Sequence, residues 1–526
     1  MRLSLFLLAG CLPPILVDTG VPLDSGSGVV DSADSADTAD SEDTADTNDT
    51  SDTNDTSEGI DADGDGHVAE SGGGDDCDDG DDAIYPAAAE YFDEVDQDCD
   101  TMISETVINY VHAANRPGAG GQAVFFARGV DAAAVELLSI ALPGAGTAVV
   151  VGVEDFRTGS ASVGSELLGM GTDDANASVG YAHMLTDLDN DGVLDWMVGA
   201  PGTGSGDGAL YVVEGDAFSV RQNIDLDGLA PIALHTIIAD GVLGASAIGT
   251  AVTSFEGSIV VSTLGVVAGG AWIHDVGTIL SVAETLVSEG QRIAGDPGDL
   301  LLGQALGTAD FQCEGTPGLL ISAPAAVGGA VNSGRIFGFM PETLSGGVNV
   351  TTAEADLEIS GGLRDAYLGG FLLTGSDIDD DGCGDYAAVG YAVAGNERTV
   401  AVFRGAGGIS QIDAASQSLA IIDGIVQYDA ANIPSVAFVD VDGNFHSDLM
   451  VGEPGKSPGQ AHLFMDDVLS AGGTLGVDAA SVTATGPGTN DLFGAGIIGV
   501  DDGGHDGLLL SAPLFDGGTL YYVPTR

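Results

Sequence analysis

The fold is decided by "DLDNDGVLDWMVGAP", the stretch from Asp187 to Pro201. Aspartates stand at its positions 1, 3, 5 and 9, a glycine follows at position 6, and an apolar run then ends in Gly-Ala-Pro. Carboxylates at alternate positions of one turn can offer several oxygens to calcium, which takes about six to eight oxygen ligands. A solvated turn is the alternative, but four carboxylates in one turn would repel each other without a cation. We therefore interpret the stretch as a cation loop followed by a strand.

The stretch recurs along the chain. Copies run over Asp310–Pro324, Asp377–Tyr391 and Asp440–Pro454, with a shortened copy at Asp501–Pro513. Successive first acids lie 67, 63 and 61 residues apart (377−310, 440−377, 501−440), whereas the gap of 123 residues after Asp187 (310−187) must contain one more copy. Worn copies without an acidic loop fit at Leu243–His274 and Gln122–Val151. The sequence therefore holds seven repeats of roughly 60 residues.

Each repeat is rich in short apolar runs, such as "ALYVVEG" and "TVAVFRG", bounded by Gly, Asp or Pro. Such runs predict short strands with hardly any helix. Seven repeats of four strands predict an all-β, seven-bladed β-propeller over residues 103–526. The last repeat ends before its fourth strand, and an uncovered sheet edge invites aggregation. We predict that Thr106–Val111 fills this place by pairing with Leu520–Val523.

The repeats resemble the FG-GAP repeat of the integrin α-chain propeller, through the glycine before each loop, the acidic loop, the aliphatic strand and the Gly-Ala-Pro. The resemblance covers about four-fifths of the chain. It implies Ca²⁺ sites on one face of the propeller and ligand-binding loops, such as Gly202–Gly208, on the other. The implied metal ligands are Asp187, Asp189, Asp191, the Val193 carbonyl and Asp195; Asp377, Asp379, Asp381, the Cys383 carbonyl and Asp385; and Asp440, Asp442, Asn444 and Asp448.

Three loops depart from this pattern. Phe445 replaces the turn glycine of the Asp440 loop, which is expected to loosen it. In the Asp310 loop Glu314 keeps position 5, while Gln312 and Gly318 replace the other acids; the last loop is shortened, with acids at Asp501, Asp502 and Asp506. Whether these last two loops bind metal stays open.

The N-terminus has the features of an export signal. Arg2 precedes an apolar run from Leu3 to Leu8, too short to span a bilayer, and Leu8-Ala9-Gly10-Cys11 resembles a bacterial lipobox. The resemblance implies that residues 1–11 are a lipoprotein signal, that Cys11 is lipidated, and that the protein is an outer-membrane lipoprotein facing the cell surface or the periplasm. An ordinary cleaved signal is the alternative. Residues 12–58, of which Asp24–Glu58 is almost purely polar and acidic, are predicted to be a disordered linker.

Residues 59–102 form a small acidic segment. Asp61, Asp63 and Asp65 match the start of a calcium loop, but Gly72 stands where an EF-hand needs glutamate. The segment resembles the metal-binding module of bacterial surface proteins, which joins a DxDGDG loop, Asp-Cys-Asp-Asp, an aliphatic-Tyr-Pro and a closing Asp-x-Asp-Cys-Asp. The resemblance implies cation binding and leaves Cys77 and Cys99 as the disulfide pair. A solvated acidic linker is the alternative.

Two further cysteines, Cys313 and Cys383, lie in the acidic loops of neighbouring repeats and would face the same side of a propeller. We predict a disulfide between them, which suits an exported protein. Two separate buried thiols are the alternative.

Charge and motifs exclude several functions. The 81 Asp and Glu residues against 12 Lys and Arg give a formal net charge of −69, which argues against nucleic acids and anionic lipid surfaces as partners. The eight histidines show no metal-ligand spacing, and the one GxSxG string, Gly455–Gly459, sits in a Pro-containing loop. We therefore expect no enzyme but a monomeric, calcium-stabilised surface protein that binds another surface protein or a polysaccharide. A structural or cation-storing envelope protein and a hydrolase with an unrecognised site are the alternatives.

Overall fold

A computed structural model describes most of the chain beyond residue 60. The described residues are 61–69, 72–86, 99, 108–111, 125–153, 167–172, 174–219, 222–227, 234–240, 247–264, 269–391, 397–426, 435–486, 488–489, 492–501, 504–513 and 519–525. The predicted signal, Cys11 and the predicted linker thus lie outside the described residues. The chain divides into two compact units, Met1–Pro86 and Ala87–Arg526, which are treated separately.

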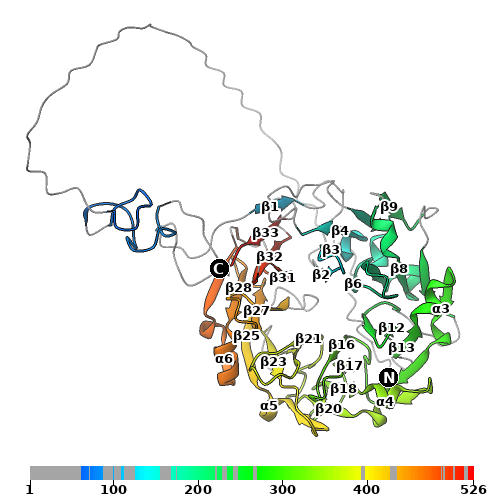
Figure 1. Cartoon of the computed structure of the whole chain (residues 1–526). Helices are drawn as coiled ribbons and strands as arrows, with labels where there is room; N and C mark the ends of the chain where they lie inside the picture. Colours follow the sequence, from blue (N-terminus) through cyan, green and yellow to red (C-terminus); the bar gives the residue numbers. More distant parts are fainter. Residues whose placement is uncertain are drawn as a thin grey trace, which may run out of the picture. The chain divides into compact units, whose positions relative to one another are not determined.

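The second unit is a seven-bladed β-propeller, as the repeats predict (Figure 1). Each blade is a sheet whose strands follow one another from the axis outward, and every degenerate copy in the sequence proves to be a blade. From the inside outward, the described strands of blade 1 are β2 (Phe125–Val130), β3 (Glu136–Leu142), β4 (Thr147–Gly152), β5 (Leu168–Gly171) and β9 (Gln222–Asp225), and those of blade 2 are β6 (His183–Thr186), β7 (Asp195–Ala200), β8 (Ala209–Val213), β10 (His235–Ile238) and β14 (Glu284–Leu286). Blade 3 has β11 (Val252–Phe255), β12 (Ser258–Thr263), β13 (Gly270–Asp275), β15 (Gln291–Ala294) and β19 (Val350–Thr351), and blade 4 has β16 (Leu306–Ala309), β17 (Gly318–Ala323), β18 (Arg335–Phe339), β20 (Leu357–Ser360) and β24 (Gln411–Asp413). Those of blades 5 to 7 are β21 (Phe371–Ser376), β22 (Asp385–Tyr391), β23 (Glu397–Phe403), β25 (Ala420–Val426) and β29 (Gly473–Gly476); β26 (Val436–Val439), β27 (Asp448–Glu453), β28 (Gln460–Phe464) and β30 (Val482–Thr485); β31 (Ile497–Asp501), β32 (Asp506–Ala512), β33 (Thr519–Val523) and β1 (Ile108–Val111).

Blades 1 to 5 each carry a fifth strand, where the sequence predicts only four. This strand pairs in parallel with the outer strand of its blade, although it belongs in sequence to the next blade: β9 precedes β10 of blade 2 but pairs with β5 of blade 1. The fifth strand thus covers the outer edge of one blade with a segment that belongs in sequence to the next blade. A covered edge is less able to pair with a strand of another chain.

The ring closes through strands from the two ends of the propeller. Strand β1 pairs antiparallel with β33, and the register places Ile108 opposite Tyr522 and Val111 opposite Thr519. The predicted closure is therefore confirmed for residues 108–111, while Thr106 lies outside the described residues. Figure 1 shows β1 beside β33 at the outside of blade 7.

The core consists of seven apolar clusters, one at each junction between neighbouring described blades. At the closing junction, Leu138 and Ile140 of blade 1 pack with Leu509 and Tyr522 of blade 7. Neighbouring backbones also approach closely at the glycine of Gly-Ala-Pro. A Cβ added to Gly199 would lie 2.0 Å from the carbonyl oxygen of Gly249 in the next blade, so only glycine fits there. The glycines of the repeat therefore serve blade packing.

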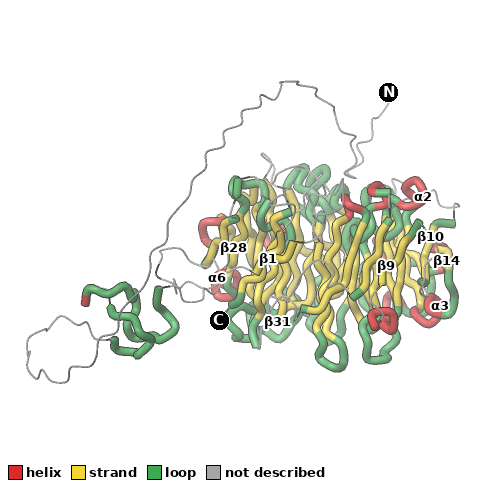
Figure 2. Tube along the Cα trace, turned by 90° about the horizontal axis from the view of Figure 1, so that it is seen from above, coloured by secondary structure: helices red, strands yellow, loops and turns green. Residues whose placement is uncertain are grey.

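Short helices lie between strands, at α2 (Thr203–Gly206), α3 (Val276–Leu280), α4 (Pro341–Leu344), α5 (Ala414–Gln417) and α6 (Asp466–Ala471). Helix α2, in the loop after the first Gly-Ala-Pro, lies on one face of the ring, and α3 lies on the opposite face (Figure 2). Among the described residues no helix is long and apolar enough to cross a membrane.

We predict that the propeller needs β1. Deleting residues 1–111 should lower the free energy of unfolding by about 3 kcal/mol or more, because a ladder of backbone hydrogen bonds, each contributing a net of about 1 kcal/mol, is lost and β33 is left as an open edge. Deleting residues 1–100 keeps β1 and should change the stability little. Denaturant unfolding of the two truncated chains measures the difference, and equal stabilities would contradict the closure.

Candidate metal centres

The loops between the first two strands of blades 2, 5 and 6 share one backbone fold, built on the first aspartate. In blade 2, the Asp187 carboxylate accepts hydrogen bonds from the amides of Asp191 (3.1 Å) and Gly192 (3.0 Å). In blade 6, Asp440 accepts the amides of Asn444 (3.1 Å) and Phe445 (3.0 Å). Asp377 of blade 5 accepts the Gly382 amide at 3.0 Å. The first acid therefore folds the turn around itself, and the other acids follow on the same short loop.

The ninth residue of each loop is an aspartate that begins the second strand and is almost fully buried. Asp195 accepts hydrogen bonds from the amides of Leu188 (2.8 Å) and Gly215 (3.0 Å), so it links its loop to the segment after β8. Asp385 accepts the amides of Ile378 and Gly405, and Asp448 those of Val441 and Asp466, in the same arrangement. The ninth position thus fixes the base of the loop.

Three carboxylates gather in each of these loops. Ligand oxygens from positions 1, 3 and 9 lie within 4.8 Å of one another in the sets Asp187, Asp189 and Asp195; Asp377, Asp379 and Asp385; and Asp440, Asp442 and Asp448. The side chain at position 5 instead accepts the amide of position 7: Asp191 from Val193, Asp381 from Cys383 and Asn444 from His446, at 2.7–2.9 Å. The structure therefore brings together the predicted ligand side chains at positions 1, 3 and 9 of each loop. The predicted ligand at position 5 is bound to a backbone amide of its own loop.

Blade 5 shows most clearly that these loops can hold a cation. The Oδ1 atoms of Asp377 and Asp379 are buried and have no hydrogen-bond partner among the described residues. An ionised oxygen without a partner is costly to bury. A divalent cation bound between the two side chains would satisfy both oxygens, and hard oxygen donors are the ligands that calcium prefers. The residues present therefore fit a cation of this kind.

A basic side chain that sequence reasoning missed adjoins this loop. The Arg404 Nε forms an ion pair with Asp379 Oδ2, and Arg404 directly precedes Gly405, which binds Asp385. Glu214 and Met465 hold the corresponding places in blades 2 and 6, next to Gly215 and Asp466. Arg404 thus balances part of the negative charge of the blade 5 loop. No repeat pattern signals this residue, because it lies after the third strand.

Phe445 keeps the turn of the blade 6 loop, contrary to the expected loosening. It adopts the left-handed conformation (φ +70°) that Gly192 and Gly382 adopt in the other loops, and its amide makes the same bond to the first aspartate. The ring is 85% exposed. A bulky residue at positive φ is strained, so the hydrogen bonds of the loop outweigh that strain.

The two degenerate loops are held in other ways. Asp310 of blade 4 still accepts the amides of Glu314 (2.9 Å) and Gly315 (2.7 Å), but no group of three ligand side chains gathers there among the described residues. In blade 7, Asp506 forms an ion pair with Arg128 of blade 1 at 2.9 Å, while Asp502 lies outside the described residues. Backbone hydrogen bonds to Asp310 therefore hold the blade 4 loop, and the ion pair with Arg128 holds the blade 7 loop.

The N-terminal unit contains a fourth loop of the same kind. Asp61 accepts the amides of Gly64 (2.6 Å) and Gly66 (3.1 Å), and oxygens of Asp61, Asp63 and Asp65 lie within 4.8 Å of one another. Asp76, which we did not assign as a ligand, is 1% exposed, and its Oδ2 has no hydrogen-bond partner among the described residues. Burial and the charges of Asp65, Asp76 and Asp61 raise the pKa of Asp63.

Both predicted disulfides are present. A bond joins Cys77 and Cys99, and another joins Cys313 and Cys383.

The carboxyl group at position 9 has a strongly raised pKa in all three loops. Burial, with a smaller contribution from neighbouring acids, raises the pKa of Asp195 to about 6 and the pKa values of Asp385 and Asp448 to about 7. Without a cation these groups are therefore partly protonated near neutral pH, and a bound cation would favour their ionised form.

The described residues give no support to the GxSxG string as a nucleophile site. It lies in the loop between strands β27 and β28, whereas a nucleophile elbow joins a strand to a helix. His462 is bound to Glu453 (2.9 Å) and Thr483 (3.0 Å), and burial lowers the pKa of His183 to about 3 and that of His274 to about 4. These histidines are built into the sheets.

One family model matches part of the chain, and several solved structures resemble the chain at low sequence identity. The family model Cu-binding MopE, described as "Putative metal-binding motif", matches residues 76–105. A search of curated proteins finds no match. Similar solved structures include the Dos1 propeller (11% identity, 75% of this chain and 76% of that chain, TM-score 0.37), Kuenenia stuttgartiensis hydrazine synthase (12%, 79% and 100%, 0.42) and a Fusarium graminearum α-L-arabinofuranosidase (8%, 80% and 97%, 0.37).

The raised pKa values predict an unusual pH dependence. Between about pH 4, where aspartate ionises in an unfolded chain, and pH 7, the folded protein holds protons that the unfolded chain has released, so stability falls as pH rises through this window. In excess chelator, the melting temperature should therefore rise as the pH is lowered from 8 to 5. Calcium should flatten this dependence.

The control is a chain with Asp195→Asn, Asp385→Asn and Asp448→Asn, which removes the three titrating groups and keeps their shape. Its melting temperature should depend less on pH than that of the chelated wild type. An equal pH dependence in both chains would show that these groups are not responsible.

Proposed function

We propose that this chain is a calcium-stabilised lipoprotein of the outer membrane whose FG-GAP-like propeller binds a polysaccharide or a surface protein, without catalysis and as a monomer. The observation that carries the calcium site is that the buried Oδ1 atoms of Asp377 and Asp379 have no hydrogen-bond partner in the part of the chain that the structure describes. The same loop fold recurs in blades 2 and 6, and the chain carries 81 acidic against 12 basic side chains. Cations are therefore the natural small partners of this protein.

The position of the loops supports a structural role for the cation. Each loop starts at the end of an inner strand, and its last aspartate holds both the loop and the segment after the third strand. A cation bound to positions 1, 3 and 9 would join these segments in the folded state only. It would then stabilise the blade by mass action, in proportion to the logarithm of its concentration above the dissociation constant.

A hollow on blade 4 supports glycan binding. It has a volume of about 380 Å³ and is lined by residues of the paired strands β20 and β24 and of adjoining loops. Five polar side chains line it together with apolar groups: Glu358, Ser360, Gln411, Asp413 and Gln417, with Ile412 and glycines 329, 361 and 362. Carboxylates, amides and hydroxyls are the groups that hydrogen-bond sugar hydroxyls, and the volume lies within the range of small-ligand sites, about 300–1,000 Å³.

Anchoring to the membrane rests on the lipobox resemblance. Stable anchoring requires more than one acyl chain, and we propose Cys11 as their point of attachment. Labelled fatty acid should be incorporated into the wild type and not into Cys11→Ser; equal labelling would reject this part of the proposal.

Calcium removal tests the metal sites. We expect calcium to raise the melting temperature of the chelated protein, and Asp379→Ala to lower the calcium stoichiometry by about one site, because a buried ligand of blade 5 is lost. Calorimetric titration of the wild type and the variant gives the stoichiometry. The matched control is Asp423→Ala, which changes an acid of strand β25 outside the cation loops. Identical melting curves with calcium and with chelator would contradict the proposal.

A glycan array tests ligand binding. The calcium-loaded protein should bind a subset of glycans, and Gln411→Ala should weaken that binding by about tenfold, since a hydrogen-bonding group of the hollow is removed without unfolding the blade. Asn349→Ala is a control on a polar residue that does not line the hollow. Binding that is absent from both glycan and surface-protein screens would favour a structural or cation-storing protein, and turnover on hydrolase substrates would favour an enzyme.

A further inference from the structure

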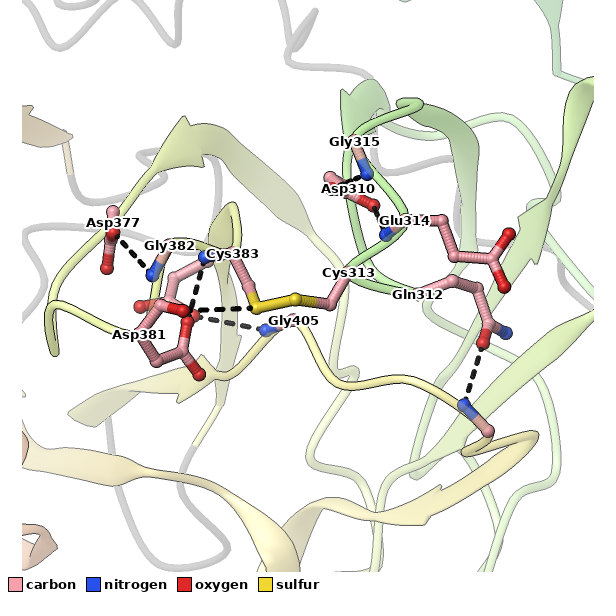
Figure 3. Close-up of a disulfide and its surroundings, with 12 residues drawn as sticks. Asp310, Gln312, Cys313, Glu314, Gly315, Asp377, Asp381, Gly382, Cys383 and Gly405 are labelled. Atoms are coloured by element: carbon pink, nitrogen blue, oxygen red, sulfur yellow. Dashed lines mark hydrogen bonds between the residues drawn. A yellow bond between two sulfur atoms is a disulfide. The ribbon is translucent and has the colours of Figure 1, made fainter.

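A disulfide joins the acidic loops of two neighbouring blades. Cys313 lies in the loop between β16 and β17 of blade 4, and Cys383 in the loop between β21 and β22 of blade 5 (Figure 3). Their Cα atoms are 4.9 Å apart, although 70 residues separate them in sequence. The bond therefore connects a loop that lacks a carboxylate cluster to one that has it.

Cys383 is part of the blade 5 cation loop itself. It stands at position 7, from which calcium loops supply a backbone carbonyl oxygen, and its amide donates to Asp381 Oδ1 at 2.9 Å. Asp385 follows two residues later and is fully buried. Moving Cys383 would therefore move a backbone oxygen and the connection between two acids of the loop.

The blade 4 loop also hydrogen-bonds to the segment from Gly405 to Ile409, whose first residue donates to Asp385. Gln312 Nε2 donates to the Ile409 carbonyl at 3.3 Å, and its Oε1 accepts the Gly408 amide at 3.2 Å. The Ala406 amide donates to the Phe311 carbonyl at 3.1 Å.

Gly405 connects these contacts to the cation loop. Its amide donates to Asp385 Oδ1 at 3.1 Å, and a Cβ at this position would lie 2.7 Å from the Asp310 carbonyl oxygen. The segment from Gly405 to Ile409 is thus packed between the blade 4 loop and the buried acid of blade 5. In the blade 4 loop, Gln312 stands at position 3, where a complete loop has an acid, and Cys313 follows at position 4. Here Gln312 hydrogen-bonds to blade 5, and Cys313 is bonded to Cys383 of blade 5.

We propose that the Cys313–Cys383 disulfide holds the blade 5 loop in its calcium-binding geometry, so that its reduction weakens calcium binding at Asp377, Asp379 and Asp385, and bound calcium opposes the reduction. The inference rests on the proposed function, because it requires calcium in this loop. It makes the site responsive to the thiol–disulfide state of its surroundings.

The chemistry requires a dithiol as reductant. Its thiolate attacks the exposed Cys313 sulfur, the bond to Cys383 breaks in a mixed-disulfide step, and the second thiol of the reagent releases Cys313. Two electrons pass to the protein sulfurs, which end as two protonated thiols, and the reagent ends as its own disulfide. Cys383 is 5% exposed, so Cys313 is the accessible point of attack.

The blades are expected to stay packed after reduction. An apolar cluster that includes Phe311 and Leu320 of blade 4 and Tyr386 and Phe403 of blade 5 fills the junction beneath the two loops. The effect of reduction should therefore be confined to the loops, which separates it from unfolding.

The first experiment measures calcium affinity at the blade 5 loop alone. In the full-length chain, Asp63→Ala, Asp189→Ala and Asp442→Ala remove the other candidate sites, and calcium is titrated by calorimetry. Adding Cys313→Ser to this background should weaken the remaining site about fivefold, and treating the background chain with dithiothreitol should do the same. Cys313→Ser isolates the effect, because a dithiol also reduces the Cys77–Cys99 bond.

The second experiment needs no variant. Dithiothreitol is applied to the wild type with calcium or with chelator, and alkylation of Cys383 is followed by mass spectrometry. Because coupling between two equilibria is reciprocal, calcium should shift the disulfide equilibrium toward the bonded form by about the same fivefold factor.

The outcomes separate the two proposals. Equal affinity with and without the disulfide, together with reduction that does not respond to calcium, would overturn the inference and leave the calcium site standing. A background chain that binds no calcium even with the disulfide intact, and that is unaffected by adding Asp379→Ala, would overturn both.

Discussion

Buried carboxylates are the constraint on which this propeller depends. The chain has 81 acidic and 12 basic side chains, yet the blades place Asp195, Asp385 and Asp448 in the interior beside other acids. Backbone amides satisfy their hydrogen bonds but leave their charges unpaired. Burial therefore raises their pKa values toward neutrality, and either a proton or a bound cation would relieve the cost of burying their charges.

The loop between the first and second strands carries different groups in different blades. Blades 2, 5 and 6 offer a cluster of three carboxylates to a cation. Blade 7 pairs Asp506 with Arg128 of the next blade, and blade 4 replaces ligands by Gln312 and a disulfide to blade 5. In each of the last two cases the substituted group also links neighbouring blades. The loops thus serve both charge balance and the cohesion of the ring.

The features that repeat were the ones that could be predicted from the sequence. The acid spacing, the glycine of Gly-Ala-Pro and the short strands recur every 60 or so residues, and they predict the blade number, the cation loops and the closure by β1. The fifth strands could not be found in this way. Strand β19 has only two residues, Val350 and Thr351, which is too short to show a period, and its partner lies in another repeat.

Single residues that act across blades were also missed. Arg404 reaches Asp379 from beyond the third strand, and the charge of Asp76, from another part of the N-terminal unit, contributes to the raised pKa of Asp63. Phe445 was expected to loosen its loop because bulky residues avoid positive φ. The hydrogen bonds to Asp440 hold it in that conformation, which residue propensity alone does not reveal.

A crystal structure of the protein grown with a lanthanide in place of calcium tests the central claim most directly, since anomalous scattering locates the ion without assumptions about its ligands. The account predicts anomalous peaks in the propeller between Asp187 and Asp195, between Asp377 and Asp385 and between Asp440 and Asp448, and none in the Asp310 loop, where no carboxylate cluster forms among the described residues. Peaks confined to surface acids outside these three loops would contradict it.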